Sequence, residues 1–200
     1  DLELSKELVL GTSSTRRVAF LKHLYPHIKT VPVRGNLQTR IRKMKEGACD
    51  ALMLAYAGAH RMGYNEQIVI TLPEKEFIPA VGQGSVAIEC CTNLDPDKKE
   101  KIRALTNHKP TETRLLAERA FLRKLEGGCS IPVFALATID NGTVSLEGGI
   151  ISLDGKQMVR FTASASTDNP ALAGEDLAEK VLSSGGSEIL KEIKQQINNN

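Results

Sequence analysis

Leu125-Glu126-Gly127-Gly128-Cys129-Ser130-Ile131-Pro132-Val133 is the stretch at which the chain changes from a helical to a strand pattern. Apolar residues recur at helical spacing from Glu112 to Leu125, and an alternating apolar run begins after Pro132. The two glycines predict a helix C-cap with left-handed backbone and leave little side-chain bulk beside Cys129. Cys129 therefore has two interpretations, a buried cysteine after a Schellman turn or a reactive thiol on an open corner.

Downstream of this stretch, the sequence has the pattern of a small α+β domain. Asn-Gly at 141–142 and Asp-Gly at 154–155 separate alternating segments, which predicts a three-stranded antiparallel meander. Two amphipathic helices separated by Gly185-Gly186 are expected to cover one face of that sheet. The expected strands are 133–139, 144–152 and 157–165, and the expected helices are 170–184 and 187–197.

The first part of the chain repeats a strand, a turn and a helix. Strands are expected at 8–10, 30–33 and 51–54, and helices at 15–24, 37–45 and 55–62. Successive β-α units predict a parallel sheet with helices on its faces, and ligands of such sheets lie at the carboxyl ends of the strands.

Charge is distributed unevenly along this first part. No Asp or Glu occurs from Leu8 to Lys45, although the same span is rich in basic residues. A solvated basic face normally interleaves acids, so a one-signed block of this length favours an anionic partner. The basic residues are Arg16, Arg17, Lys22, Lys29, Arg34, Arg40, Arg42, Lys43 and Lys45, with His23 and His27.

The positions of the arginines indicate where the anion would bind. The turn Thr12-Ser13-Ser14 leads into a helix whose first turn carries Arg16 and Arg17, and a helix N-terminus offers N–H groups to anions. The next unit has the turn Arg34-Gly35-Asn36 followed by Arg40, and Arg61 closes the third helix. We expect the first four arginines to converge on one sheet edge, where guanidinium groups bind carboxylates or phosphates in bidentate fashion.

Several other classes of site have no support in the sequence. Neither a Walker A motif nor G-x-G-x-x-G is present, and aromatics are 4% with no Trp, which disfavours nucleotide and nucleic-acid binding. No apolar run is long enough to span a membrane. The cysteines at 49, 90, 91 and 129 lack metal-ligand spacing and suit reduced thiols in the cytoplasm, so we expect no metal.

The middle of the chain joins the two patterned parts. Val81-Gly82-Gln83-Gly84 predicts a tight crossing between domains, with Gln83 available for a hydrogen bond, and 85–91 has a strand pattern. A helix at 97–105 precedes the long helix that starts near Thr111. We therefore divide the chain into a βα anion-binding domain at 1–80, a hinge and return segment at 81–106, and a C-terminal α+β domain at 107–200.

Five motifs resemble the hydroxymethylbilane synthase (porphobilinogen deaminase) family in order and spacing over essentially the whole chain. They are Gly11-Thr-Ser-Ser-Thr-Arg-Arg17, Arg34-Gly-Asn36 with Arg40, Ala57-Gly-Ala-His-Arg-Met-Gly63, Val81-Gly-Gln-Gly84, and Ala117-Glu-Arg-Ala120 running into Leu125-Glu-Gly-Gly-Cys-Ser130. The resemblance implies an α/β fold, with a periplasmic-binding-protein-like βα domain followed by the α+β domain.

The resemblance also implies a function. Cys129 would carry a dipyrromethane cofactor through a thioether, and four porphobilinogen units would be condensed to hydroxymethylbilane with release of ammonia. The partners would be porphobilinogen and oligopyrrole intermediates, whose acetates and propionates would match the acid-free block. The binding residues carried over are Thr12, Ser13, Ser14, Arg16, Arg17, Arg34, Gly35, Asn36, Arg40, Arg61 and Gln83.

Two departures from the family pattern affect this interpretation. Pro32 stands where the family usually has a small polar residue, so one hydrogen bond to a carboxylate is expected to be missing. The family's first domain, with the aspartate thought to stabilise the pyrrole intermediates, has no counterpart here, and no catalytic residue is assigned. We expect little or no synthase activity from this chain alone, and an orphaned segment at 85–91 that would normally return to the first domain.

Two alternatives of other classes stay open at this point. The chain could be a non-catalytic module that binds a small carboxylate, or a basic nucleic-acid binder, which the scarcity of aromatics disfavours. For the full-length form we expect a cytoplasmic monomer that binds neither nucleic acid nor a membrane.

Overall fold

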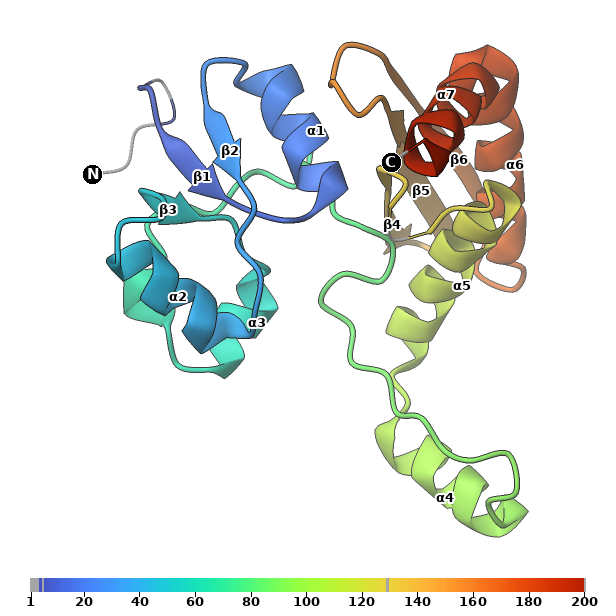
Figure 1. Cartoon of the computed structure of the whole chain (residues 1–200). Coiled ribbons are helices and arrows are strands. Elements are labelled where there is room, and N and C mark those ends of the chain that lie inside the picture. Colours follow the sequence, from blue (N-terminus) through green and yellow to red (C-terminus); the bar gives the residue numbers. More distant parts are fainter. Residues whose placement is uncertain (1–3, 5, 129, 200) are drawn as a thin grey trace.

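The computed structural model describes residue 4, residues 6–128 and residues 130–199. The elements form two groups along the chain, with α4 at the end of a long connection below them (Figure 1). The first group is β1 (Val9–Gly11), α1 (Thr15–Leu24), β2 (Lys29–Val31), α2 (Leu37–Lys45), β3 (Ala51–Leu52), α3 (Tyr56–Arg61) and a 3₁₀ turn (Asn65–Gln67). The second is α4 (Pro96–Thr106), α5 (Lys109–Lys124), β4 (Val133–Asp140), β5 (Thr143–Ile151), β6 (Met158–Ser166), α6 (Ala171–Val181), a π-helical turn (Leu182–Gly186) and α7 (Ser187–Asn198).

The first group contains the expected parallel sheet. Its strand order is β2-β1-β3, and all pairs are parallel. Two strands are shorter than expected: β2 ends at Val31 and β3 at Leu52, where the chain turns out of the sheet. The N–H of Met53 still donates to Gly11 O at 3.1 Å, so the last ladder bond lies one residue past β3.

The second group contains the expected antiparallel meander, in the order β4-β5-β6. Asn141 and Gly142 both have positive φ, 45° and 77°, as a two-residue hairpin turn with the twist of its strands requires. Asp140 and Thr143 pair on either side of this turn. The Asn-Gly dipeptide thus fixed the register of β4 and β5 locally.

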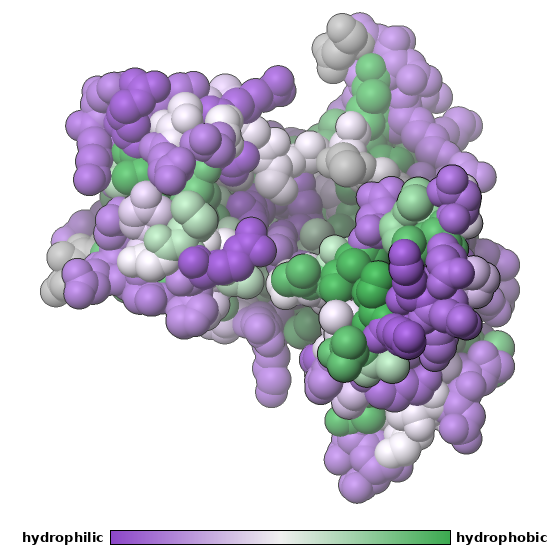
Figure 2. Space-filling view, turned by 90° about the horizontal axis from the view of Figure 1, so that it is seen from below, coloured by the Kyte–Doolittle hydropathy of each residue, from purple (hydrophilic) through white to green (hydrophobic). Residues whose placement is uncertain are grey.

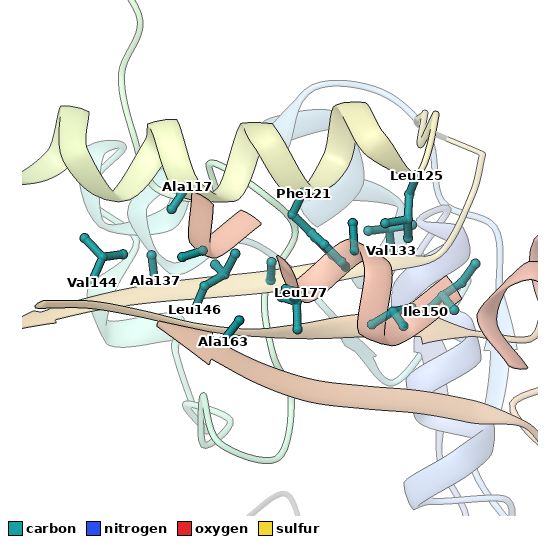
Figure 3. Packing of buried hydrophobic residues seen from close by; sticks show 14 of the residues in the cluster. Ala117, Phe121, Leu125, Val133, Ala137, Val144, Leu146, Ile150, Ala163 and Leu177 are labelled. Carbon is teal, nitrogen blue, oxygen red and sulfur yellow. The ribbon is translucent and has the colours of Figure 1, made fainter. Parts of the chain in front are cut away.

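One face of this meander is packed against α5, α6 and α7 (Figure 3). Phe121 from α5, Leu146 from β5 and Leu177 from α6 are fully buried there. Gly174 allows α6 to approach α5 closely, because a Cβ at this position would lie 2.6 Å from Phe121 N and collide with Ala117 O. The C-terminal group therefore has a continuous, tightly packed core.

The opposite face of the meander contacts the first group through α1. The Phe20 ring lies 4.9 Å from that of Phe134 on β4. Lys22 donates to Leu153 O at 3.1 Å, and His23 Nδ1 lies 2.8 Å from Gly155 O. Successive residues of a strand point to opposite faces, so β4 contributes to both cores.

The expected strand at 85–91 is wrong. This segment is irregular and pairs with no strand of the part of the chain that the structure describes. Val86 is 78% exposed and Ile88 61%, and nearby on α4 Leu105 is 86% exposed. The alternating pattern is present, but a strand also needs a hydrogen-bonding neighbour. Hydrophobic side chains are accordingly visible on this lower side of the molecule (Figure 2).

The C-terminus of α5 has the expected Schellman motif, with a different residue in the left-handed conformation. Gly127 N donates to Leu122 O at 3.0 Å and Glu126 N to Arg123 O at 3.0 Å, which are the two bonds of the motif. The left-handed residue is Glu126, with φ 50°, and neither glycine. Gly127 is needed for space, because a Cβ there would lie 2.5 Å from the Leu122 side chain.

The two last helices are separated at Gly185-Gly186, as expected, but α6 ends at Val181 and not near 184. The intervening residues form a π-helical turn in which Gly185 has φ 101°. This backbone favours glycine and bends the chain so that α7 packs back onto the core. No helix among the described residues is long and apolar enough to cross a membrane.

Candidate functional site

The candidate site begins at the turn between β1 and α1. Gly11 lies so close to neighbouring strands that a Cβ would lie 2.7 Å from Cys49 Sγ. Thr12 is buried and its N–H donates to Val31 O at 2.9 Å, while Thr12 Oγ1 accepts from Ser14 N at 3.3 Å. Ser14 is the N-cap of α1. The Gly-Thr-Ser-Ser sequence thus forms a rigid turn that places the N-terminus of α1 at the carboxyl end of β1.

Arg16 lies on the first turn of α1 and is only 8% exposed. One guanidinium nitrogen donates to Ile78 O at 2.6 Å, and the group lies 6.0 Å from the Phe20 ring and 5.9 Å from the Phe77 ring. Burial, and secondly the nearby charge of Arg17, lower the pKa of Arg16 to about 10. The group still carries its charge at neutral pH, because that pKa lies well above 7.

Arg17 is directed toward the end of β3. Its guanidinium donates to Met53 O at 2.7 Å. Burial lowers the pKa of Arg17, and the charge of Arg40 on α2 adds to this effect. The structure therefore brings Arg16, Arg17 and Arg40 into electrostatic contact. No ion pair among the described residues involves any of the three.

The turn between β2 and α2 repeats this arrangement on the surface. Asn36 caps α2, with its side-chain oxygen accepting from Thr39 N at 2.8 Å, and Gly35 has φ 125°. Arg40 Nε donates to Gly35 O at 2.7 Å, so its guanidinium is held beside the turn. Arg34 is exposed in the same turn. Two turn-helix junctions thus present cations at neighbouring ends of parallel strands.

A cavity of about 440 Å³ adjoins the buried arginines. Arg16, Arg17 and Gln83 line it, as do the acidic residues Asp50 and Glu74, together with mostly apolar side chains. These include Leu10, Leu21, Ile41, Met53, Tyr56, Ile68, Leu72 and Phe77. A concave, mostly apolar pocket with a few convergent polar groups is the usual form of a small-molecule site.

Of the described residues that the sequence predicts as ligands, only Arg16, Arg17 and Gln83 line this cavity. Arg61 is exposed at the end of α3 and does not line the cavity. Cys129 lies outside the described residues, and its neighbours Gly128 and Ser130 are exposed. Among residues 4, 6–128 and 130–199, no group of His, Cys, Asp or Glu side chains could hold a metal ion.

Sequence reasoning missed how deeply parts of the site are buried. The packing of Arg16 against the neighbouring rings of Phe20 and Phe77 depends on residues far apart in the chain. The sequence places Glu118 on a helix, but it does not show that this side chain is 6% exposed and accepts hydrogen bonds from two backbone N–H groups. The available signal was its spacing, because Glu118 lies three residues before buried Phe121 and seven before Leu125.

The chemistry of this arrangement is anion binding. Desolvated guanidinium groups without carboxylate partners bind an incoming anion more strongly than exposed, paired ones. Two such groups, Arg16 and Arg17, at one mostly apolar cavity favour a ligand with more than one carboxylate on a partly apolar body.

Comparison with known proteins identifies the family of this chain. The family model described as "Porphobilinogen deaminase, dipyromethane cofactor binding domain" matches residues 2–99, and the one described as "Porphobilinogen deaminase, C-terminal domain" matches residues 112–183. The chain belongs to the porphobilinogen deaminase family. The two matched ranges leave residues 100–111 between them, which cover most of α4 and the start of α5.

Individual relatives in the porphobilinogen deaminase family align along nearly the whole chain. The porphobilinogen deaminase of Desulfosudis oleivorans is 51% identical over 199 residues, which are 98% of this chain and 64% of the relative. That of Cytophaga hutchinsonii is 55% identical over 197 residues, 96% of this chain and 62% of the relative. That of Synechococcus elongatus is 45% identical over 190 residues, 95% and 59%. The chain thus spans about three fifths of the length of these curated relatives.

Proposed function

We propose that this protein acts in the porphobilinogen deaminase (hydroxymethylbilane synthase) reaction of tetrapyrrole and haem biosynthesis. In that reaction four porphobilinogen units are condensed head to tail, with loss of ammonia, to hydroxymethylbilane. The observation that carries the proposal is the group of guanidiniums at the strand ends without a carboxylate partner among the described residues, in a chain of this family. Each pyrrole unit brings an acetate and a propionate for these cations.

The residues of the chain would bind and orient the carboxylates. Guanidinium forks form two parallel hydrogen bonds with a carboxylate, each about 1.5–3 kcal/mol in strength for charged partners. N–H and hydroxyl donors of the β1–α1 turn would bind oxygens that the arginines leave unpaired. The proposed ligand residues are Thr12, Ser13, Ser14, Arg16, Arg17, Arg34, Gly35, Asn36, Arg40, Arg61 and Gln83.

The donor set fits the dipyrromethane cofactor named in the family description. That group carries several carboxylates, and Arg16, Arg17 and Arg40 form a cation cluster without an ion-pair partner among the described residues. We propose Cys129 as its covalent attachment point. When bound, the group supplies the primer on which the pyrrole chain is extended.

The role of the described residues in this proposal is binding, orientation and charge neutralisation. No described carboxylate forms an ion pair with the arginine cluster, and we assign no general acid or base. The three described cysteines, Cys49, Cys90 and Cys91, are free thiols, as is usual in a reducing cytoplasm. We place the protein there, as a monomer in its full-length form.

Intact mass under denaturing conditions tests the proposal. We expect the purified protein to carry a mass excess equal to two linked pyrrole units, and the Cys129→Ser variant to lack it. Cys91→Ser removes an exposed thiol elsewhere and serves as the matched control. An adduct that persists in Cys129→Ser contradicts the attachment site. Tight porphobilinogen binding without any adduct would instead support a non-catalytic carboxylate-binding module.

A further inference from the structure

Glu118 is a buried carboxylate that the proposed chemistry leaves without a role. It lies on α5, and its two oxygens accept from two backbone N–H groups of different segments. Oε2 accepts from Gly82 N at 2.7 Å, and Oε1 accepts from Ala137 N at 3.0 Å. One side chain therefore links α5, β4 and the turn that follows the first structural group.

The link closes the open edge of the C-terminal sheet. β4 is an edge strand, so alternate N–H groups along it have no strand partner. The N–H of Ala135 donates to Pro79 O at 3.2 Å. Two residues further along β4, the carboxylate of Glu118 takes the place of a backbone acceptor for Ala137. The segment from Pro79 to Gly82 thus runs beside β4, fixed at both ends.

The turn held in this way carries Gln83. Gly82 and Gly84 have φ 73° and 86°, and Ser85 N donates to Gly82 O at 3.2 Å, so the turn has a defined shape. Gln83 lines the cavity of Arg16 and Arg17. It also lines a second cavity of about 480 Å³, to which Glu118 contributes. Gln83 is thus a lining residue of both cavities.

We infer that Glu118 is a positioning residue that, in its ionised form, fixes the turn at 81–84 to the C-terminal sheet and holds Gln83 against the arginine cavity. We further infer that protonation of Glu118 releases the turn. An ionised carboxylate accepts from both N–H groups at full strength, whereas protonation makes one of its oxygens a donor and a weaker acceptor. The effect on ligand binding rests on the proposed function, whereas the proton-controlled link does not.

The surroundings of Glu118 are consistent with such a change. Burial raises the pKa of Glu118, while the two N–H groups and Arg114 oppose that rise. Among the described residues that line the second cavity, Arg114 and His108 are the other titratable groups. His108 Nδ1 lies 2.8 Å from Thr111 Oγ1, one helical turn before Arg114. Any experiment must therefore distinguish a change at Glu118 from a change at His108.

Backbone amide NMR tests the link directly. We expect the amide resonances of Gly82 and Ala137 to shift together between pH 4 and 7 in the unsubstituted protein and in the His108→Gln background. The shift should disappear in Glu118→Gln and persist in Glu179→Gln, an exposed glutamate of α6 that serves as control. Amides that do not titrate, or that titrate unchanged in Glu118→Gln, overturn the link. The dispersion of the same spectra shows whether each variant is folded.

Calorimetric titration with porphobilinogen at pH 7.5 tests the positioning role. We expect Glu118→Gln and Gln83→Ala each to weaken binding about fivefold, and the double variant to be no weaker than Gln83→Ala, because residues that act through one another are not additive. Additive losses would show that Glu118 does not act through Gln83 and would overturn the role. If the unsubstituted protein does not bind porphobilinogen, the proposed function fails, and the amide titration still decides the link.

Discussion

The two structural groups of this chain bury charged side chains in different ways. In the C-terminal group, helices α5–α7 and the meander enclose a core of apolar side chains, and Glu118, the one buried charge among its described residues, is hydrogen-bonded through both oxygens. In the first group, Arg16 is buried with a single carbonyl partner, and a cavity of about 440 Å³ adjoins it. Unpaired buried charge is costly, so its presence beside a cavity indicates a surface prepared for an anion.

The groups meet at α1, and their contact explains why one can support the other. The outer face of α1 packs on β4 and the β5–β6 turn, where a Cβ at Gly155 would lie 2.6 Å from Ala19 O. Arg16 and Arg17 project from the first turn of the same helix. A well-packed domain thus fixes the orientation of the helix that carries the cations, and pre-organised donors lose less entropy on binding.

The largest effect is expected at the cations of the first group. Arg17→Met should weaken porphobilinogen binding about 10–100-fold, because charged hydrogen bonds of about 1.5–3 kcal/mol are lost. The free energy of unfolding should change little, since one desolvated cation is removed. Titration calorimetry and urea unfolding measure the two quantities.

Arg42→Met is the matched control for this variant. Arg42 is exposed on α2 and pairs with Glu46. Its substitution therefore changes the net charge by the same amount without altering the lining of the cavity. Arg61→Met extends the test to the predicted ligand that lies apart from the cluster. Equal losses in all three variants would mean that binding depends on net charge and not on a local site.

A smaller effect is expected when one helical glycine in each group is replaced by alanine. Gly174→Ala should destabilise the protein by about 1–2 kcal/mol, because overpacking against α5 costs about 1–3 kcal/mol and improved helix propensity offsets up to about 1 kcal/mol. Gly58→Ala on α3 should stabilise it by about 0.5–1 kcal/mol, since a Cβ there meets nothing within 4 Å. Urea denaturation of both variants measures this contrast. Equal effects of either sign would show that the groups do not differ in packing.

The smallest effect is expected where α4 joins α5. Hydrogen bonds from Asn107 and Arg103 lower the pKa of Glu112 to about 2 from its ordinary 4.5. A carboxyl with a lowered folded-state pKa stabilises the fold above its unfolded pKa, and this contribution is lost as pH falls toward 2. The difference in urea midpoint between the unsubstituted protein and Glu112→Gln should therefore be constant above pH 5 and shrink below it. A difference that is independent of pH would refute this assignment.

Much of the fold was predictable because its signals are local. Asn141-Gly142 has the backbone that a tight hairpin needs, and Ser14 and Asn36 cap the helices that follow them. The three βα units and the meander depend on such signals. The segment 85–91 has the same alternation as a real strand, yet a strand exists only where a neighbour accepts its hydrogen bonds. Likewise, the left-handed residue after α5 is Glu126 and not one of the glycines, because Glu126 directly follows the C-cap Leu125.

The sequence predicted which residues of the candidate site carry charge, but not how deeply their side chains are buried. Which residues carry positive charge, and which strand ends they follow, can be read from the chain, and Arg16, Arg17 and Arg40 do lie together. The packing of Arg16 against Phe20 and Phe77, the cavity, and the double hydrogen bond of Glu118 join residues between 4 and 62 positions apart in the chain. Such contacts depend on how separate elements pack, for which sequence spacing carries no information.

The amino-acid sequence by itself determined the βα repeats, the hairpins, the acid-free block of arginines and the family of the chain, because each depends on short-range backbone preference or on residue identity. Only the tertiary structure decided which cations are desolvated, which turn carries the side chain that lines both cavities and which carboxylate holds that turn. Desolvation and hydrogen-bond geometry are properties of packed surfaces, so they exist only once α1, the turn at 81–84 and the edge of β4 have been brought together.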